Sequence, residues 1–497
     1  MKDERQYRTP FFTKLKNYGT SDVAPFDVPG HKLGRIKNDL LDFIGPNTFR
    51  LDANAPIGLD TLSKPQGVLR EAEKLMATAF NADKSFFLTG GTTTGILAMI
   101  MATCRANDKI ILPRNVHKSV INALILSGAV PVFVKPDIDI ELGIANGVFC
   151  ETYEDAILNH PDAKALFIIN PTYFGITSDI EAITKIAHDN DMLVLVDEAH
   201  GAQFYFSDRL PMTAMDAGAD ISATSIHKTG GSFTQSSVLL TKGKRIDHLR
   251  LRSTLNMLQS TSPSSLLMAS LDVARKTMYF EGKRRIDKLL NMAEKARMAL
   301  KSIPGLKIVD QEYAANREGF SFDETKLVIK VSDLGLSGFE VIQKMRKRYQ
   351  IQLELAETSI VLAVLSIGTT KDDLDRLVDA FKDLSKMYYK VRKRLPKIKF
   401  VYQFPEAYAR PRDAYHAPKL NVTLEEAYDK IAAESIMIYP PGIPFVIPGE
   451  IISQQVIDDI KYYLKKGSVI HSELDNGYIK IIDKDHWIKW EGDDDEF

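Results

Sequence analysis

Two segments of this chain indicate its architecture: Leu193-Val-Leu-Val-Asp-Glu-Ala-His200 and Ile221-Ser-Ala-Thr-Ser-Ile-His-Lys-Thr-Gly-Gly231. The first contains a short apolar run, which predicts a buried strand that delivers Asp197 and His200 at its carboxyl end. The second predicts another short strand, which presents Lys228 just before a glycine pair. We therefore expect an acidic residue and a lysine at the ends of two nearby strands.

A carboxylate and a lysine amine in this arrangement are the groups that pyridoxal phosphate (PLP) requires. The carboxylate keeps the pyridine nitrogen protonated, so that the ring accepts electrons, and the amine forms the Schiff base that holds the cofactor. Three lysines follow a histidine, Lys32, Lys118 and Lys228, but only Lys228 has an acidic strand end upstream and glycines behind it. We predict a PLP site built on Asp197 and Lys228; the alternative for Lys228 is an ordinary surface lysine.

Apolar strand-like runs alternate with helix-sized segments between about residues 80 and 240. The runs are Lys109–Leu112, Pro131–Val134, Ala165–Asn170, Leu193–Val196 and Ser237–Leu240. This alternation indicates βαβ units around a mostly parallel sheet with helices on both faces. Ligands of such sheets bind at the carboxyl ends of the strands, and most of the candidate site residues follow strand runs.

The pattern changes after about residue 250. Apolar residues at helical spacing from Ile286 to Leu300 predict a long amphipathic helix that ends near Pro304. The segments Thr325–Val331 and Ser359–Leu365 predict strands of a second, smaller sheet. A capping pattern, Thr370–Asp373, opens a further helix.

These patterns divide the chain into four parts. We expect an N-terminal arm (1–20), a PLP-binding large domain (21–280), a small α/β domain (281–389) and a C-terminal module (390–497). The basic stretch Lys390–Lys397 is interpreted as a solvated hinge, and the acidic tail Glu491–Phe497 as frayed.

Composition narrows the classes of partner. With 64 basic and 65 acidic residues the net charge is −1, so we expect no nucleic acid and no charged membrane as partner. The two cysteines, Cys104 and Cys150, are too few for a disulfide framework or a metal cluster, and we expect both reduced and no metal. The polar start is unlike a signal peptide, and no apolar run is long enough to cross a bilayer. We expect a cytoplasmic protein.

A glycine-rich loop, Thr89–Gly95, precedes a helical run. The free N–H groups and the positive dipole end of a helix N-terminus attract an anion, and the hydroxyls of Thr92, Thr93 and Thr94 add donors. The loop lacks the lysine of a Walker motif, so a nucleoside triphosphate is not expected. We predict that it holds the cofactor phosphate; the alternative is an ordinary helix cap.

Other polar residues also follow predicted strands. Ser225 stands two positions before His227, so we expect both on one strand face, with Ser225 donating to the phosphate; its alternative is a plain strand serine. His117 follows the strand at Ile110 and could lie over the ring, although a lone loop histidine is more often structural. Thr172 lies in a strand-to-helix turn and is a candidate for contact with cofactor or substrate.

These residues, in this order, resemble the Orn/Lys/Arg decarboxylase family of fold-type-I PLP enzymes. The resemblance covers nearly the whole chain, and its last segment is the most specific because it belongs to the family's C-terminal domain. It implies an α/β protein with a fold-type-I PLP-dependent transferase-like large domain and mostly parallel sheet, a smaller α/β domain and a C-terminal α+β decarboxylase domain. The matching segments are Pro29–Lys32, Gly58–Leu62, Thr89–Gly95, Arg114–Ser119, Asp197–His200, Ser225–Lys228, Thr261–Pro263 and Tyr439–Glu450.

The resemblance also implies roles for single residues. Lys228 is then the Schiff-base lysine, Asp197 the pyridinium partner and His117 the residue stacked on the ring. By the resemblance, Ser225, His227, Thr93 and Thr94 surround the phosphate and ring. We also expect cofactor contacts from Thr92, Ala199 and Thr261, and substrate contacts from His31, Thr172 and Glu450. The resemblance further implies a homodimer or higher oligomer with interface active sites. The chain shows no counterpart of the receiver-like N-terminal domain of the long enteric members, so their ring-shaped decamers are not assumed for it.

A PLP site does not by itself name the reaction. Transaminases of this fold usually hold the substrate α-carboxylate with an arginine on a late strand, and the comparable run Ser359–Gly368 contains none. Leaving that carboxylate unclamped in an apolar setting favours decarboxylation. We favour α-decarboxylation of a basic amino acid, arginine before lysine and ornithine, with His200 or Lys228 protonating Cα. The alternatives are a PLP-dependent aminotransferase or side-chain lyase, and a non-catalytic PLP-binding scaffold.

Glu450 ends a proline-rich run whose limited φ freedom can fix a carboxylate in place. We expect it at the mouth of the site, paired with the distal cation of the substrate. The alternatives are that Glu450 only caps the following helix, or that Asp52 or Glu198 pairs with the substrate instead.

Overall fold

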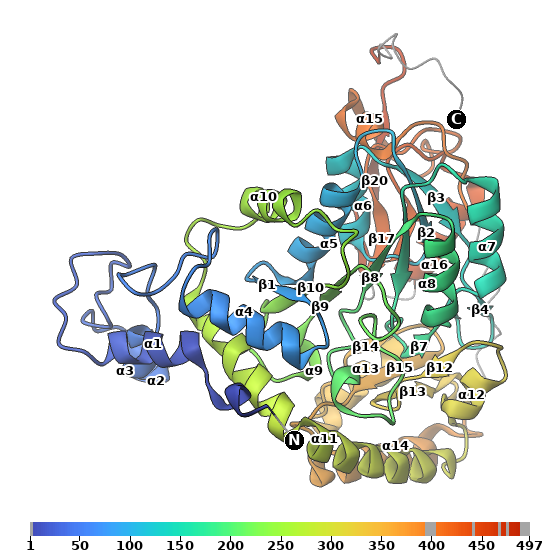
Figure 1. The fold of residues 1–497 in the computed structure, drawn as a ribbon. Helices are drawn as coiled ribbons and strands as arrows, with labels where there is room; N and C mark the ends of the chain where they lie inside the picture. The colour runs from blue at the N-terminus through green and yellow to red at the C-terminus, as the bar shows by residue number, and fades with distance from the viewer. Residues whose placement is uncertain (1–2, 393–403, 440–442, 466–468, 474–476, 488–497) are drawn as a thin grey trace.

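The computed structural model of the chain describes residues 3–392, 404–439, 443–465, 469–473 and 477–487. Figure 1 shows a large domain built around a central sheet, a small domain at one end of it, a C-terminal module beside it and an N-terminal segment that projects to one side. None of the helices in the described ranges is both long enough and apolar enough to span a membrane.

A seven-stranded sheet forms the centre of the large domain. Its strand order is β1 (Lys84–Leu88), β10 (Ser237–Thr241), β9 (Ile221–Thr224), β8 (Leu193–Asp197), β6 (Ala165–Ile169), β2 (Lys109–Pro113) and β3 (Val130–Val134). The run from β9 to β3 is parallel, and β10 is antiparallel to both of its neighbours. The prediction of a mostly parallel sheet is confirmed, and each predicted strand run lies in it.

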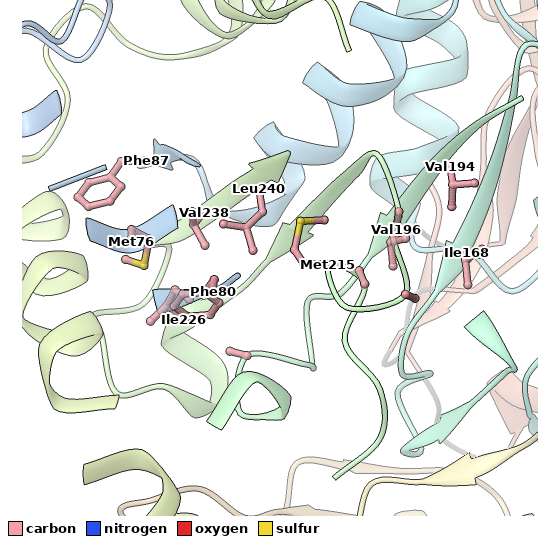
Figure 2. Packing of buried hydrophobic residues seen from close by; sticks show 14 of the residues in the cluster. Met76, Phe80, Phe87, Ile168, Val194, Val196, Met215, Ile226, Val238 and Leu240 are labelled. Carbon is pink, nitrogen blue, oxygen red and sulfur yellow. The ribbon is translucent and has the colours of Figure 1, made fainter. Parts of the chain in front are cut away.

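The strands are apolar because both faces of the sheet are buried. Successive side chains of β6 alternate: Leu166 and Ile168 face one layer, and Ala165 and Phe167 the other. Figure 2 shows the first layer, where Ile168 lies near side chains of β8. The helices that cover this face are α4 (Val68–Ala79), α7 (Cys150–Asn159) and α8 (Ile180–Asp189), and those that cover the other face are α5 (Gly91–Thr103), α6 (Lys118–Ser127) and α10 (His248–Leu258).

One helix, α11 (Ser265–Lys301), connects the large and small domains. Its first half packs Leu271 into the core of the large domain, and its second half packs Leu289 and Leu300 into the core of the small domain. The helix predicted from Ile286 to Leu300 is present, but it begins earlier, where Ser264 accepts a hydrogen bond from Leu267 N. The chain therefore passes the expected boundary at residue 280 without leaving the helix.

The small domain holds a four-stranded antiparallel sheet. Its order is β11 (Lys307–Ile308), β13 (Lys326–Lys330), β15 (Ile360–Val364) and β14 (Leu355–Ala356). Helices α11, α13 (Gly338–Tyr349) and α14 (Lys371–Tyr388) cover one face, and α14 opens with the predicted capping box between Thr370 and Asp373. The other face packs against Phe174 and Ile176 of the large domain, next to the loop that follows β6.

The C-terminal module combines helices with small sheets. It contains α15 (Pro411–His416), α16 (Gln454–Lys465), the pair β16 (Lys419–Thr423) and β20 (Tyr478–Ile482), and the set β18 (Ile443–Val446), β17 (Ile436–Tyr439) and β19 (Val469–His471). The module docks on the large domain, where Arg412 Nε donates to Ile125 O over 2.9 Å and Ile447 enters the apolar core. Parts of three predicted features lie outside the described residues: the hinge (393–397), the proline-rich run (440–442) and the acidic tail.

The N-terminal residues lie partly against the large domain and partly away from it. Helix α1 (Pro10–Gly19) packs Phe11 and Leu15 into the core, and Phe11 N donates to Asp272 on α11 over 3.0 Å. The following segment projects from the body, in blue in Figure 1, and carries α2 (Asp39–Ile44) and α3 (Pro46–Arg50). The shorter elements of the chain are η1 (Glu4–Tyr7), β4 (Ile138–Asp139), β5 (Ile144–Ala145), β7 (Ile176–Thr177), η2 (Phe204–Phe206), α9 (Ile226–Thr229), α12 (Gln311–Ala315), β12 (Ser321–Phe322) and η3 (Ser332–Leu334).

Candidate active site

A pocket of about 760 Å³ opens at the carboxyl ends of the parallel strands β2, β6, β8 and β9. This is the edge at which sheets of this kind bind ligands. Ten of the residues singled out from the sequence line it: Thr92, Thr93, His117, Thr172, Asp197, Ala199, His200, Ser225, His227 and Lys228. Segments far apart in the sequence therefore converge on one cavity, as the strand ends predicted.

Asp197 is the last residue of β8, and only 7% of it is exposed. Within the described part of the chain its carboxylate accepts one hydrogen bond, from Ala199 N over 3.1 Å. Burial raises the pKa of Asp197, while the neighbouring His117 and Lys228 act to lower it. A buried carboxylate with so little hydrogen bonding needs a cationic or N–H partner from the pocket. A protonated pyridine nitrogen meets that need.

Lys228 stands on α9, a single helical turn that directly follows β9. The prediction that Ser225 and His227 share a strand face is wrong, because Ser225 is the cap residue of this turn and His227 lies within it. The turn nevertheless brings all three side chains to the pocket. Burial lowers the pKa of Lys228, which favours the neutral amine that a nucleophile requires.

His200 and Lys228 form a close pair, with Lys228 Nζ 2.9 Å from His200 Nε2. Burial, together with the charge of Lys228, lowers the pKa of His200 well below its ordinary value, so the imidazole is neutral at neutral pH. Its Nδ1 is buried and has no hydrogen-bond partner among the described residues. The ring packs on Tyr173, with the ring centroids 4.5 Å apart.

His117 lines the pocket from the start of α6, where it is also the N-terminal cap. Its Nδ1 accepts a hydrogen bond from Ser119 N over 3.2 Å, which fixes the orientation of the ring. Desolvation lowers the pKa of His117, against the opposing effect of Asp197. A neutral, oriented imidazole close to Asp197 fits the predicted position over a cofactor ring.

The first turn of α5 forms the polar end of the pocket. Thr92 Oγ1 shares a hydrogen bond with Ser225 Oγ and donates to Ser237 Oγ over 3.1 Å. Gly91 begins the helix with a φ of 74°, a conformation that favours glycine, and its N–H donates to Gln235 O over 2.8 Å. The hydroxyls and the helix N-terminus together suit a phosphate.

Thr94 does not take part in this cluster. Its Oγ1 donates to Gly90 O over 3.1 Å and its side chain does not line the pocket, so the structure does not bring Thr94 together with the other predicted cofactor contacts. A Cβ on Gly90 would lie 2.2 Å from this hydroxyl, which explains why glycine suits position 90.

Glu450 also lies elsewhere than predicted. It is 3% exposed, and it accepts hydrogen bonds from Arg114 Nη1 over 2.5 Å, Arg114 Nη2 over 2.8 Å and Ile447 N over 2.8 Å. A buried carboxylate that is already paired with a guanidinium is not available to a substrate cation. The structure therefore corrects the placement of Glu450 at the mouth of the site.

The two alternatives to Glu450 do not line the pocket either. Asp52 lies 3.1 Å from His31 Nε2. Glu198 is fully buried and accepts hydrogen bonds from Tyr205 Oη over 2.5 Å and Ala214 N over 2.8 Å. Both carboxylates thus have partners within the chain.

Of three further predicted residues, two lie apart from the pocket and one lines it. His31 belongs to the projecting segment, and Thr261 is exposed in the loop before α11; neither lines the pocket of its own chain. Thr172 does line it, but its hydroxyl accepts a hydrogen bond from Ile176 N over 3.2 Å and so shapes the turn.

Sequence reasoning missed Tyr173, Gln235 and Glu354, all of which line the pocket. Tyr173 stood in a segment that the pattern had singled out, beside Thr172. No sequence signal marks Glu354, because it precedes the two-residue strand β14 and reaches the pocket only through the packing of the small domain.

Cys104 and Cys150 are both free in the structure. In the described ranges no cluster of three or more His, Cys, Asp or Glu side chains is arranged to hold a metal ion.

Comparisons with known proteins agree with this geometry. The family model for the major domain of Orn/Lys/Arg decarboxylases matches residues 9–373, and the model for their C-terminal domain matches residues 394–472. A Bacillus subtilis protein named arginine decarboxylase is 42% identical over 95% of this chain and 96% of its own length. One of the same name from Halalkalibacterium halodurans is 40% identical over 97% and 99%. The crystal structure of the Francisella novicida lysine decarboxylase LdcF, 24% identical, shares the fold with a TM-score of 0.84 over 96% of this chain and 82% of that chain.

Proposed function

Since the chain belongs to the Orn/Lys/Arg decarboxylase family, we propose that it is a PLP-dependent decarboxylase that converts arginine to agmatine. The observation that carries the proposal is the convergence of Asp197, Lys228, His117 and His200 on one pocket. Arginine is preferred over lysine and ornithine because relatives about 40% identical over nearly the full length bear the name arginine decarboxylase. A cytoplasmic role in polyamine biosynthesis is part of this proposal.

The pocket residues fit PLP. The N-terminus of α5 with Thr92 and Ser225 would hold the phosphate, Asp197 would pair with the pyridine nitrogen, and His117 would lie against the ring. Lys228 would carry the cofactor covalently. When bound, PLP supplies an electron sink for the bond that breaks at the substrate Cα.

Lys228 and His200 form the proton-transfer pair of the site. Their nitrogens are 2.9 Å apart, so a proton can move between Lys228 Nζ and His200 Nε2 along this hydrogen bond, and burial lowers the pKa of Lys228, which favours release of its proton. Either residue can therefore protonate Cα after carbon dioxide leaves. Because Asp197 is buried beside them, it stabilises a positive charge developing on this side of the pocket.

The lining favours loss of the carboxylate over transamination. Ile96, Ile169 and Phe174 present an apolar wall, which excludes water and destabilises an ionised carboxylate. No arginine is among the described residues that line the pocket, so the α-carboxylate lacks the clamp that a transaminase provides.

A substrate panel tests the proposal. Purified protein with PLP is incubated separately with arginine, lysine, ornithine and an aromatic amino acid. The assay measures the products of decarboxylation, which are carbon dioxide and agmatine or a diamine, and the product of transamination, which is a keto acid. We expect agmatine and carbon dioxide from arginine, and slower turnover of lysine and ornithine. Keto acid as the main product would show an aminotransferase, and no turnover of any amino acid would favour a non-catalytic PLP-binding protein.

Lys228→Ala identifies the site within that assay. Loss of the nucleophile should lower the rate by several orders of magnitude while the fold is retained. The matched control is Lys118→Ala, because Lys118 also follows a histidine but is exposed and does not line the pocket. Wild-type activity in the Lys228 variant would disprove its assignment.

We also propose a homodimer with the active site at the interface. The projecting segment carries Phe26, Phe43 and Ile57, which are 97%, 90% and 103% exposed. Exposed apolar side chains gathered on one segment mark a protein–protein contact, and a second copy would cover them. His31 of this segment and Thr261 would then reach a partner's pocket. Light scattering should give a dimer, and a monomer with full activity at dilute concentration would contradict the proposal.

A further inference from the structure

Two carboxylates line the pocket, and they lie in different environments. Asp197 is buried at the end of β8, where it suits the cofactor ring. Glu354 is exposed, and it comes from the small domain, immediately before β14. Its backbone N–H donates to Leu362 O on β15 over 3.0 Å, so the sheet of the small domain holds the residue in place. Glu354 is thus a fixed, solvent-accessible carboxylate on the wall of the site.

Tyr173 links Glu354 to the reacting groups. Its hydroxyl donates to Glu354 Oε1 over 2.5 Å. Its ring centroid lies 4.5 Å from that of His200 and 5.7 Å from Lys228 Nζ. The aromatic ring therefore lies between the Lys228–His200 pair and the carboxylate. The negative charge of Glu354 also acts to raise the pKa of Lys228, so Glu354 lies within electrostatic range of the reaction centre.

A basic amino acid fits this arrangement. If its Cα lies at Lys228 and His200, its side chain can extend along the face of Tyr173, and its distal cation then meets Glu354. A carboxylate offers about four acceptor sites, and the hydrogen bond from Tyr173 occupies one of them. The remaining sites can pair with a guanidinium or an ammonium.

We propose that Glu354, oriented by Tyr173, binds the distal cation of the substrate and selects basic amino acids. This inference rests on the proposed function and takes over the role that the sequence had suggested for Glu450. A purely structural reading, in which the Tyr173–Glu354 hydrogen bond only joins two domains, leaves unexplained why the carboxylate remains exposed in the pocket.

The main test is Glu354→Gln, assayed with arginine and with citrulline, whose neutral ureido group has nearly the shape of guanidinium. Loss of the charge should lower kcat/KM for arginine about 10- to 100-fold, because charge-assisted hydrogen bonds are about twice as strong as neutral ones. The value for citrulline should change far less, so the ratio between the two substrates falls. The control is Glu318→Gln, which removes an exposed carboxylate of the small-domain region outside the pocket. That variant should leave both values unchanged.

Equilibrium binding gives a readout that is independent of turnover. Agmatine keeps the guanidinium but has no carboxylate to lose, so calorimetry can follow its binding to the PLP-loaded protein. Glu354→Gln should weaken agmatine binding by about the same factor as it lowers kcat/KM for arginine. Tyr173→Phe should have a smaller effect, because it keeps the ring and removes only the hydrogen bond that orients Glu354.

The outcomes separate this inference from the proposed function. If Glu354→Gln distinguished arginine from citrulline as well as the wild-type protein does, and bound agmatine equally well, the proposed role of Glu354 would be overturned. Arginine decarboxylation would still stand. If the wild-type protein decarboxylated no basic amino acid, the proposed function would fail and this inference with it. A fall in citrulline turnover equal to that for arginine would show that Glu354 acts through Lys228 instead, and would also overturn the inference.

Discussion

Replacing Glu450 by glutamine should destabilise the protein without changing its preference among basic amino acids. The side chains of Arg114 and Glu450 are 1% and 4% exposed, and two hydrogen bonds join them. The guanidinium also lies over the ring of Phe133, 4.7 Å from its centroid. The variant would leave a buried guanidinium facing a neutral amide.

The expected loss follows from the burial of this pair. Removing one partner of a buried ion pair costs about 3–5 kcal/mol, because the other charge stays buried without compensation. The amide oxygen of glutamine can still accept from Ile447 N, as Glu450 does over 2.8 Å. We therefore expect the free energy of unfolding to fall by about 3 kcal/mol, the lower end of that range. Since Arg114 belongs to the large domain and Glu450 to the C-terminal module, the loss should first weaken the docking of that module.

Urea unfolding and substrate assays together test this prediction. The control is Glu425→Gln, whose partner Lys461 is 2.8 Å away but whose pair is exposed and screened by water, so the free energy of unfolding should hardly change. A double variant, Arg114→Met with Glu450→Leu, should recover much of the stability, because apolar side chains can replace a buried pair. Wild-type stability in Glu450→Gln, combined with a 10- to 100-fold loss in arginine use, would refute the reasoning and return Glu450 to the substrate.

Three further predictions concern single groups. Asp197→Asn should retain some cofactor but turn over about 100-fold or more slowly, because a neutral amide cannot keep the ring nitrogen protonated; an unchanged kcat would remove Asp197 from its role. Burial raises the pKa of Glu357 to about 8. Between about pH 4.5 and 8, Glu357 therefore stays protonated in the folded protein but loses its proton in the unfolded chain, where its pKa is near 4.5. The free energy of unfolding should fall across this range as the pH rises, by up to ~1.4 kcal/mol per pH unit. Glu357→Gln should flatten this dependence in urea titrations at pH 5 and pH 8, and equal slopes would contradict the assignment. Thr92→Val should weaken PLP retention, measured by absorbance after dialysis, more than Thr94→Val does, because Thr94 Oγ1 bonds to Gly90 O instead of facing the pocket; equal losses would count against this placement of the phosphate.

Much of the large domain was predictable because its signals are local. The run Leu193–Val196 is apolar throughout because a central parallel strand is buried on both faces, and this holds whatever the rest of the chain does. The polar residue that ends such a run lies at the edge of the sheet where ligands bind, and this rule was enough to predict that Asp197 lines the pocket. Local reasoning failed at Ser225 and His227, because one helical turn, not a strand, follows β9. The apolar run ends at Thr224, and the few residues after it carry too little periodicity to distinguish a turn from a continued strand.

The sequence by itself determined the groups that follow the strands and open α5, among them Asp197, Lys228 and Thr92, since strand ends and a glycine-rich helix start follow from short-range patterns. Only the tertiary structure decided which carboxylate faces the pocket. Glu450 stood in the more suggestive motif, but folding places it against Arg114, a residue far away in the sequence. Glu354 carries no motif, yet the packing of the small-domain sheet against the loop after β6 sets it beside Tyr173. The physical reason is that the pairing of a charged side chain depends on which distant segment is packed against it, and no local periodicity contains that information.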